Sequence, residues 1–347
     1  MKLSENTKQT RKIQLSGGST YIISMPKEWI EELKIKVGEN VTIVKNSNKS
    51  LTLFPREHGN DKNQTTATII SSQKDSGESV KRKIIAAYLA GYKTIQIKTK
   101  GMKIPSEHSR SIRELVHSSM IGTEIVESSS EAMTIQILTR LPELSFESAL
   151  KRMHLMAINM IKEAIESLEE KDIPHADEVI NMDDEVDRFG LYMRRNLVLA
   201  IENQSILEDM GLKRPSDCLE YRTIVGKIER IGDHASLIAK RIKFIEDEID
   251  LKTISKIKKL SEKALEVFEE SMMSVQNHDF QKAENVAEKV SKIIEEEKEI
   301  MSKINDNGKN STVIKFILED LRRIIEYSGD IAEVAIDENI QSIISEE

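Results

Sequence analysis

The stretch YRTIVGKIERIGDHASLIAKRIKFI, residues 221–245, decides how most of this chain folds. Its apolar side chains recur in alternating steps of three and four residues: Tyr221, Ile224, Ile228, Ile231, Ala235, Ile238, Ile242 and Ile245. This spacing lines them along one face of an α-helix, and such a face must be buried against other helices. The stretch therefore predicts a long helix that packs inside a helical bundle.

The same periodicity extends through the C-terminal part of the chain. The apolar stripe of residues 314–335 also advances in steps of three and four. We predict six helices in this part, near residues 145–171, 174–203, 216–246, 252–277, 280–304 and 311–342. Because each stripe needs partner helices, one long six-helix bundle or two three-helix bundles would satisfy the pattern.

An internal repeat divides these helices into two units. ERIGDHASLIA, residues 229–239, aligns without gaps to RRIIEYSGDIA, residues 322–332, and this alignment pairs Asp233 with Glu326. More weakly, ADEVINMDDEVD, residues 176–187, matches AENVAEKVSKII, residues 283–294. The repeat predicts two copies of one three-helix unit, at about 144–248 and 252–345.

Two pairs of acidic residues stand out within the first unit. Glu229 and Asp233 are four residues apart, as are Asp183 and Asp187 on the preceding predicted helix. Like charges at this spacing cost about 0.2–0.5 kcal/mol, and Gly232 between them costs about 1 kcal/mol relative to alanine. Their heptad positions place the acids away from the apolar stripe, and neither Glu229 nor Asp187 has a basic partner along its own helix.

Two interpretations of these acids stay open. A charged face of a bundle is commonly just solvated, whereas a hard cation needs several oxygen ligands in a small volume, which two such pairs would supply. The flanking glycines would leave room for an ion to approach. His234 could add a nitrogen ligand, but its place at the edge of the apolar stripe favours a packed or solvent-facing side chain.

Two smaller blocks precede the bundle. Residues 8–57 contain short β-rich runs around one helical stretch, PKEWIEELKI, with proline at its first position. Residues 65–140 alternate in the order β-α-β-α-β-β, which predicts a small α/β domain with helices on one face of its sheet. We therefore predict a multidomain α+β protein, with domains at 8–57, 65–140 and 144–345.

Composition restricts the class of protein. The 347 residues carry a net charge of −8, yet residues 1–62 hold 11 Lys/Arg and 7 Asp/Glu, so a basic head precedes an acidic body. The single cysteine excludes an internal disulfide framework and a thiolate zinc site. No apolar run is long enough to span a bilayer, and the first residues do not form a signal peptide. A cytoplasmic protein without membrane insertion is the expectation.

The bundle resembles the PhoU family of phosphate-uptake regulators. The resemblance rests on ERIGDHA, the upstream DDEVD and their weaker duplication, over about 200 residues. It implies two three-helix repeats whose acidic motifs bind iron or zinc clusters on the outer face. The metal-binding residues would be Asp183, Asp187, Glu229 and Asp233, with Glu326 and Asp330 in the second repeat. That repeat departs from the pattern, because Arg322 replaces the first acid, and Val290 and Ile294 replace the two aspartates.

The head resembles the AbrB/SpoVT type of DNA-binding domain, through TRKIQLSGGSTYIISMPKEWIEELKIKVGENVTI. That resemblance implies a swapped-hairpin barrel formed by two interleaved chains, because about 45 residues cannot close such a core alone. It implies a DNA surface at Arg11, Lys12 and Lys27. The stretch SGGSTY departs from the family, which commonly has an arginine before the second strand. A head of this type on a PhoU-like body resembles the archaeal phosphate-uptake regulators.

Three functions compete at this stage. The first is a non-enzymatic, homodimeric regulator of phosphate uptake, with DNA bound by the head and a divalent or trivalent metal ion, iron or zinc, bound by the bundle. The second is an adaptor that docks on a phosphate transporter or a sensor kinase, in which the head only dimerises. The third is a carboxylate-metal enzyme, which the shallow, outward acid cluster disfavours because no enclosed pocket is evident.

Overall fold

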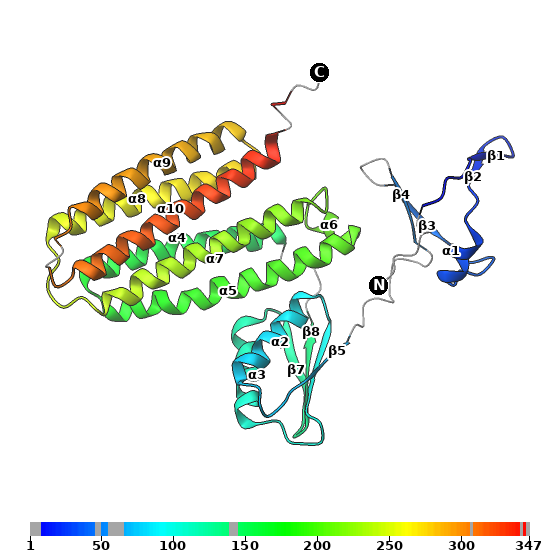
Figure 1. The fold of residues 1–347 in the computed structure, drawn as a ribbon, viewed down its shortest axis with the longest axis horizontal. Helices are drawn as coiled ribbons and strands as arrows, with labels where there is room; N and C mark the ends of the chain where they lie inside the picture. The colour runs from blue at the N-terminus through cyan, green and yellow to red at the C-terminus, as the bar shows by residue number, and fades with distance from the viewer. Residues whose placement is uncertain are drawn as a thin grey trace. The chain divides into compact units, whose positions relative to one another are not determined.

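The computed structural model describes residues 8–45, 50–54, 66–138, 145–305, 308–340 and 343–344. The chain divides into two compact units, residues 1–63 and 64–347 (Figure 1). The predicted linker 58–64 and the ends of the predicted domains at 55–57, 65, 139–140, 144 and 345 lie outside the described residues.

The N-terminal unit consists of two hairpins and one short helix. Its elements are β1 (Gln14–Ser16), β2 (Thr20–Ile22), α1 (Lys27–Glu32), β3 (Thr42–Lys45) and β4 (Leu51–Phe54). β1 pairs with β2 and β3 with β4, both antiparallel. Gly17 and Gly18 connect the first pair at φ of 62° and 81°, the left-handed conformation that tight hairpin turns require.

This unit has almost no core of its own. Among its described residues only Pro26 is buried, and α1 buries no residue at all. Large apolar side chains face solvent instead: Tyr21 is 74% exposed and Val37 is 107% exposed. Four more are at least 60% exposed, namely Ile13, Leu15, Ile43 and Leu51. An isolated chain of this length cannot stabilise such an arrangement by burial.

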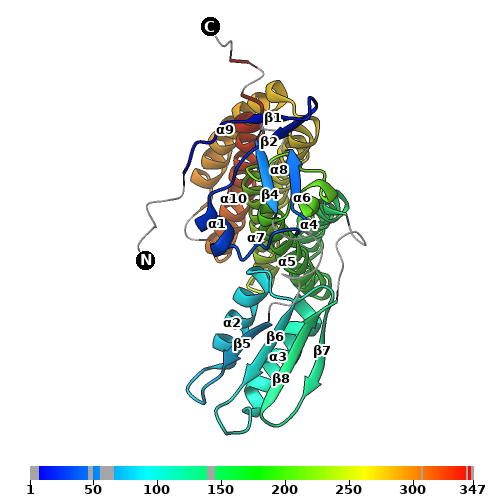
Figure 2. The same ribbon diagram turned by 90° about the vertical axis from the view of Figure 1, so that its right-hand side faces the viewer.

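Residues 66–138 form the predicted α/β domain. It contains β5 (Thr66–Ile70), α2 (Gly77–Leu89), β6 (Thr94–Lys98), α3 (Ser106–Ser119), β7 (Thr123–Ser128) and β8 (Ala132–Ile137). The sheet order is β5-β6-β8-β7, with β5 and β6 parallel and the remaining pairs antiparallel. Alternating residues of the strands, such as Ile95, Ile97 and Ile135, are fully buried beneath α2 and α3 (Figure 2).

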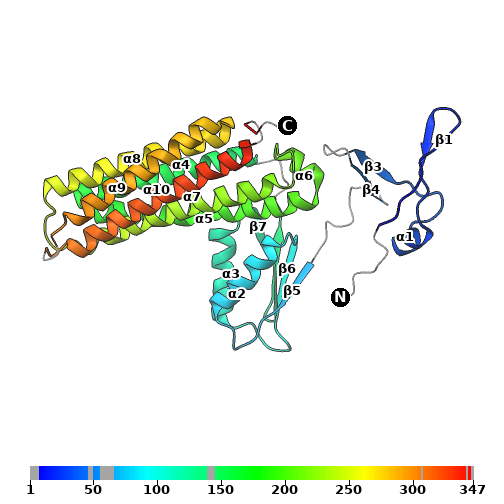
Figure 3. The same ribbon diagram turned by 45° about the horizontal axis from the view of Figure 1, so that its top comes forward.

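Six long helices form the C-terminal bundle (Figure 3). They are α4 (Phe146–Glu170), α5 (Ile173–Glu202), α7 (Asp217–Ile242), α8 (Leu251–Asn277), α9 (Phe280–Ser302) and α10 (Ser311–Asn339). Aspartates 172, 250 and 279 cap α5, α8 and α9 by accepting hydrogen bonds from first-turn amides. The predicted fold class is confirmed. α7 and α10 end before the predicted 246 and 342, and a short helix, α6 (Gln204–Asp209), was not predicted.

The helix α5 belongs to both the bundle and the α/β domain. Leu191 lies in the hydrophobic core of the α/β domain, beside residues of α2 and α3. The buried guanidinium of Arg195 donates hydrogen bonds to the carbonyl oxygens of Tyr88, Gly91 and Tyr92 at the end of α2. Its Cζ also lies 4.6 Å from the centroid of the Tyr88 ring. The α/β domain is therefore fixed to the bundle through one face of α5.

Burial agrees with the predicted alignment of the second repeat. Each buried residue of α7 from Ile224 to Ile242 aligns with a buried residue of α10 from Ile317 to Ala335. The alignment pairs Ser236, which lies beside Asp183, with Gly329. A side chain at Gly329 would meet Val290 Cγ1 at 3.3 Å on α9, and Val290 aligns with Asp183. Arg322 is therefore the counterpart of Glu229, and Glu326 that of Asp233.

None of the described helices is both long enough and apolar enough to cross a membrane.

Candidate functional site

The predicted acids of the first repeat lie where α5 packs against α7. Asp183 and Asp187 come from α5, and Glu229 and Asp233 come from α7; these four residues are called the acidic seam. The side chain of Glu229 is only 20% exposed, so the prediction of a fully outward position is wrong for this residue. It lies against α5 because position 190 is glycine: a side chain there would meet Glu229 Oε2 at 3.2 Å.

The acidic seam raises the pKa of its own carboxyl groups. Burial, followed by repulsion from Glu229 and Asp183, raises the pKa of Asp187 to about 7. Burial and the Asp233 charge raise the pKa of Asp183, and burial also raises the pKa of Glu229. Carboxylates whose pKa is raised in this way are held in the charged state at a free-energy cost. Any positive charge that entered the seam would recover that cost.

Arginines neutralise only part of the seam. Arg194 of α5 forms an ion pair with Glu229 at 2.9 Å, and Arg230 pairs with Asp233 at 3.0 Å. Arg194 was missed by the sequence analysis, which considered only partners on the same helix. Its signal was present, since Arg194 follows Asp187 by seven residues and so lies on the same face of α5.

Three buried polar atoms at the seam have no hydrogen bond among the described residues. They are Asp183 Oδ1, the hydroxyl of the fully buried Ser236 on α7, and Glu229 Oε2, which is close only to its ion-pair partner Arg194. The Ser236 hydroxyl lies close enough to lower the pKa of Asp183, although the geometry of a hydrogen bond is not met. Orphaned buried oxygens are costly, and a cation or ordered water would satisfy them.

The glycines have a different role from the predicted one. Gly190 and Gly232 are buried and allow α5 and α7 to approach closely, whereas a side chain at Gly226 would meet nothing within 4 Å. Gly232 therefore does not clear a surface for an ion. His234 is packed, as the sequence favoured: its Nδ1 lies 2.9 Å from Asp320 Oδ1, in an interhelical contact that also includes Arg241.

The donor set of the seam fits a hard cation in chemistry and charge. It offers carboxylate oxygens from two adjacent helices, and two of these oxygens are buried without a hydrogen bond among the described residues. Among the residues that the structure describes, however, no three acidic, histidine or cysteine side chains converge closely enough to hold a metal ion. The carboxylates would therefore have to turn toward one another when an ion binds.

The two predicted acids of the second repeat have basic partners. Glu326 pairs with Arg323 at 3.0 Å and with Arg322 at 3.5 Å. Asp330 pairs with Lys227, which reaches across from α7. These two acids therefore form ion pairs with basic side chains and do not belong to the acidic seam.

The predicted DNA-binding residues all lie on the exposed surface of the N-terminal unit. Arg11 and Lys12 precede β1, and Arg11 donates a hydrogen bond to Gln9. Lys27 begins α1 and pairs with Glu31 at 3.5 Å, with both side chains largely exposed. In the α/β domain, Lys81 and Lys83 are engaged with Glu114 and Asp75.

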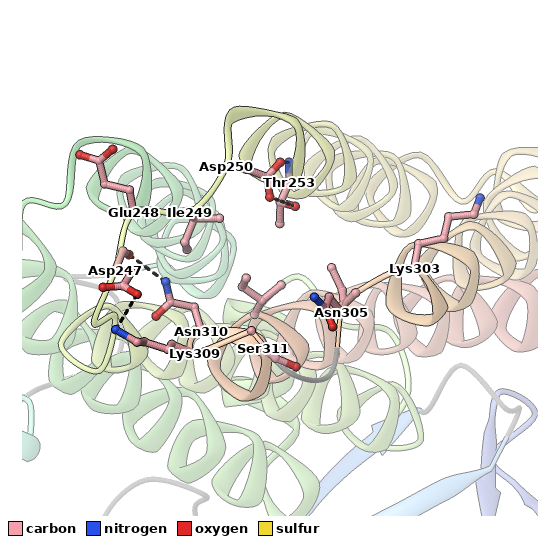
Figure 4. Close-up of a pocket in the computed structure, with 13 residues that line it drawn as sticks. Asp247, Glu248, Ile249, Asp250, Thr253, Lys303, Asn305, Lys309, Asn310 and Ser311 are labelled. Carbon is pink, nitrogen blue, oxygen red and sulfur yellow. Dashed lines mark hydrogen bonds and ion pairs between the residues drawn. The ribbon is translucent and has the colours of Figure 1, made fainter.

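A cavity of about 340 Å³ lies at the end of the bundle where α7 leads into α8 and α9 into α10 (Figure 4). Its polar lining residues contact one another: Asn310 donates to the carbonyl oxygen of Asp247, and Lys309 pairs with the Asp247 carboxylate at 3.0 Å. None of the acidic-seam residues lines it.

The head of two hairpins and the bundle of two three-helix repeats each resemble known protein families. A family model for the PhoU domain matches residues 150–242, which span α4 to α7 and include the whole seam. A family model described as antidote-toxin recognition MazE, bacterial antitoxin, matches residues 14–61. The chain therefore contains a PhoU domain and an N-terminal MazE/AbrB-like antidote domain.

Individual proteins are similar to about half of the chain. A phosphate-specific transport system accessory protein PhoU homolog from Clostridium acetobutylicum is 26% identical over 198 residues, covering 54% of this chain and 88% of the relative. A protein of the same name from Xylella fastidiosa is 24% identical over 194 residues, covering 52% and 77%. Crystal structures of PhoU from Streptococcus pneumoniae and Pseudomonas aeruginosa align with TM-scores of 0.49 and 0.47, at 18% and 19% identity, covering 58% and 57% of this chain and 96% of each structure.

Proposed function

We propose that this protein is a non-enzymatic regulator of phosphate transport that binds DNA through its head and a divalent or trivalent cation through its acidic seam. The observation that carries the proposal is the pairing of a PhoU domain with a MazE/AbrB-like head in one chain. The relatives with the same bundle are named as accessory proteins of phosphate-specific transport. The head carries a net positive charge, which attracts the phosphate backbone of DNA.

The decisive experiment compares cells grown with and without phosphate. Genome-wide DNA binding and protein capture with the tagged chain should show phosphate-dependent occupancy of specific DNA sites. Phosphate-dependent capture of a transporter or sensor kinase with no DNA occupancy would instead support the adaptor function. The absence of an arginine in SGGSTY, before β2, is the observation that favours this alternative.

The DNA surface is tested by replacing Arg11, Lys12 and Lys27 with alanine. Each lost phosphate contact should reduce the slope of log affinity against log salt by about 0.9 on duplex DNA, and most of the affinity should be lost. The matched control replaces Lys8, Lys36 and Lys45, exposed lysines of the same head, and changes the net charge equally. Equal effects of the two triple variants would mean that the head attracts DNA only through its net charge.

The assembly is proposed to be a dimer through the head. The exposed apolar side chains of β1 to β4 need a partner surface, and a second copy of the head supplies an equivalent one. Light scattering of the full chain should give at least twice its 39.5 kDa mass. Replacing Leu15 and Ile43 with aspartate should shift the mass toward the monomer; a monomeric native chain would contradict the proposal.

The cation is proposed to bind Asp183, Asp187, Glu229 and Asp233. Bound, it would supply positive charge to carboxylates that burial and mutual repulsion disfavour. Metal analysis of protein purified without chelator should find a cation, iron or zinc among those tested, that is lost on replacing Asp183 and Asp187 with asparagine. Retention of the metal in that variant would place it elsewhere.

A further inference from the structure

An arginine in the second repeat stands where the first repeat has the first acid of its seam. The alignment of the repeats pairs Glu229 with Arg322 and Asp233 with Glu326. On the neighbouring helices it pairs Gly190 of α5 with Glu297 of α9. Glu229 lies against Gly190 in the first repeat, and Arg322 acts on Glu297 in the second. The difference therefore lies in the charges placed at one equivalent helix contact.

Arg322 is held among carboxylates of its own repeat. Its guanidinium makes a two-pronged contact with Glu319, with Nη2 at 2.6 Å from both carboxylate oxygens and Nε at 3.0 Å from Oε2. Its Nη1 lies 3.5 Å from Glu326 Oε1. Paired in this way, Glu319 has a lowered pKa and Arg322 a raised one, which is the opposite of the acidic seam. A two-pronged guanidinium–carboxylate pair is directional as well as strong.

Glu297 completes this cluster from the neighbouring helix. It lies on α9 at the place that Gly190 occupies on α5, and it is only 2% exposed. Its Oε1 has no hydrogen-bond partner among the described residues, and Arg322 provides the main attraction that opposes its burial. Where the first repeat has a missing side chain beside the acid pair, the second has a buried carboxylate facing a fixed positive charge.

We propose that Arg322 is an internal cation that takes the place of a bound metal, so that the second repeat binds no ion and the chain responds to cations through its first repeat alone. The carboxylates of Glu297, Glu319 and Glu326 do not fit a metal, because a permanent guanidinium already lies among them and a cation would meet its repulsion. Arg323 and Lys227 add two further positive charges at Glu326 and Asp330. Arg322 then determines which repeat is cation-responsive. This inference deepens the proposed function and rests on its cation site.

The test measures cation binding to the full-length protein, stripped with chelator and then titrated with Zn²⁺ or Mn²⁺ alone, by calorimetry and by metal analysis after gel filtration. Replacing Glu326 with Gln and Asp330 with Asn should leave the metal bound per chain unchanged. Replacing Asp183 and Asp187 with Asn should abolish binding. Loss of metal from the first of these variants would overturn the proposal.

The converse variant removes two of the positive charges from the second repeat. Arg322→Val together with Arg323→Gly should create binding that the native repeat lacks, about one additional ion per chain, since affinity at oxygen sites follows the charge of the ligands. Adding Glu326→Gln and Asp330→Asn should remove the gain. Arg322→Lys, which keeps the positive charge, should show no gain. A folded Arg322→Val, Arg323→Gly variant without new binding would refute the role of Arg322.

Failure of the proposed cation site has a different signature. If the native chain binds neither Zn²⁺ nor Mn²⁺, the first repeat is not a cation site. The Arg322→Val, Arg323→Gly variant then still decides the inference, because a gain of binding dependent on Glu326 and Asp330 supports the internal cation and its absence contradicts it. Thermal unfolding of each variant distinguishes lost binding from lost folding.

Discussion

The acidic seam of the first repeat and the equivalent helix surface of the second carry different charges. In the first, burial and repulsion raise the pKa of Asp183, Asp187 and Glu229. In the second, Arg322 lowers the pKa of Glu319, and the acids of α10 are in ion pairs. The comparison teaches that one arrangement of helices can either keep carboxylates unneutralised, so that an external cation is needed, or neutralise them with an arginine of the chain itself.

A second difference concerns what each repeat is attached to. In the first repeat, α5 carries Arg194 toward the acidic seam and the next residue, Arg195, toward the α/β domain. In the second repeat, the equivalent positions on α9 are Met301 and Ser302, and Ser302 is exposed. The repeat with the unneutralised carboxylates is thus the one whose helix α5 is bound to the α/β domain. An ion that altered α5 would act on the joint with the α/β domain within one residue.

The largest effect is expected from breaking that joint. Arg195→Ala removes a buried guanidinium and leaves three carbonyl oxygens at the end of α2 without their donor. We expect a loss of about 3 kcal/mol in the free energy of unfolding, as for other buried charged hydrogen-bond networks. Denaturant unfolding measures the loss, and limited proteolysis should release the α/β domain from the bundle.

The matched control is Ser302→Ala at the equivalent position of α9. The Ser302 hydroxyl only donates to the Glu299 carbonyl within its own helix, so stability should change by less than about 0.5 kcal/mol. A comparable loss in both variants would mean that Arg195 is no more than a helix residue and that the joint is held by other contacts.

A smaller effect should follow from removing the internal cation. In chelator-treated protein, Arg322→Val leaves the buried Glu297 and the carboxylates of Glu319 and Glu326 without their guanidinium. We expect destabilisation by about 2 kcal/mol, below the range for fully buried pairs because the Arg322 side chain is 26% exposed. Thermal and denaturant unfolding measure it. Added Zn²⁺ or Mn²⁺ should restore part of the loss; stability equal to the native chain without metal would contradict the compensating role.

In the first repeat, removing a charge should stabilise the protein, and the gain should depend on pH. The pKa of Asp187 is about 7 in the folded chain against 3.8 as its ordinary value, so its ionisation disfavours the folded state progressively between pH 4 and 7. Asp187→Asn removes this penalty, and the variant should be more stable than the native chain above pH 7 and equal to it near pH 4. The carboxyl of Asp187 is desolvated by its contacts but still borders on solvent, and solvent screening limits the gain to about 1 kcal/mol.

Unfolding curves across this pH range, without metal, provide the measurement. A saturating cation should remove the difference between Asp187→Asn and the native chain, because it neutralises the same charge. A gain that is constant with pH would point to helix propensity or packing instead of ionisation.

The sequence predicted the helices well because their apolar spacing is a local property. The stripe from Ile224 to Ile242 and the β-α-β-α-β-β order both depend on neighbours within a few residues, and both are present in the structure. The dimeric assembly of the head remains a prediction, because its exposed Tyr21 and Ile43 require a partner surface that a single chain does not provide.

The site was less predictable because it depends on pairs of helices. Arg194 reaches Glu229 across the α5–α7 contact, and Lys227 reaches Asp330 across α7 and α10; neither follows from spacing along one helix. The repeat alignment, in contrast, depends on apolar spacing along single helices, and the buried residues of α7 and α10 follow it.

The smallest expected effects concern the glycines of α7 and α10. Gly→Ala in a helix interior gains about 1 kcal/mol from propensity, and at Gly226, where a Cβ would meet nothing within 4 Å, we expect that full gain. At Gly232 and Gly329 the new Cβ would lie 3.3 Å from a valine methyl of the neighbouring helix, so crowding should offset most of the gain. Each of these two changes should therefore alter stability by less than about 0.5 kcal/mol. Relieving the contact with Val186→Ala or Val290→Ala should then make the corresponding Gly→Ala change favourable, as double-mutant cycles of unfolding free energy would measure. Coupling in one repeat only would show that α5 and α7 approach each other more or less closely than α9 and α10 do.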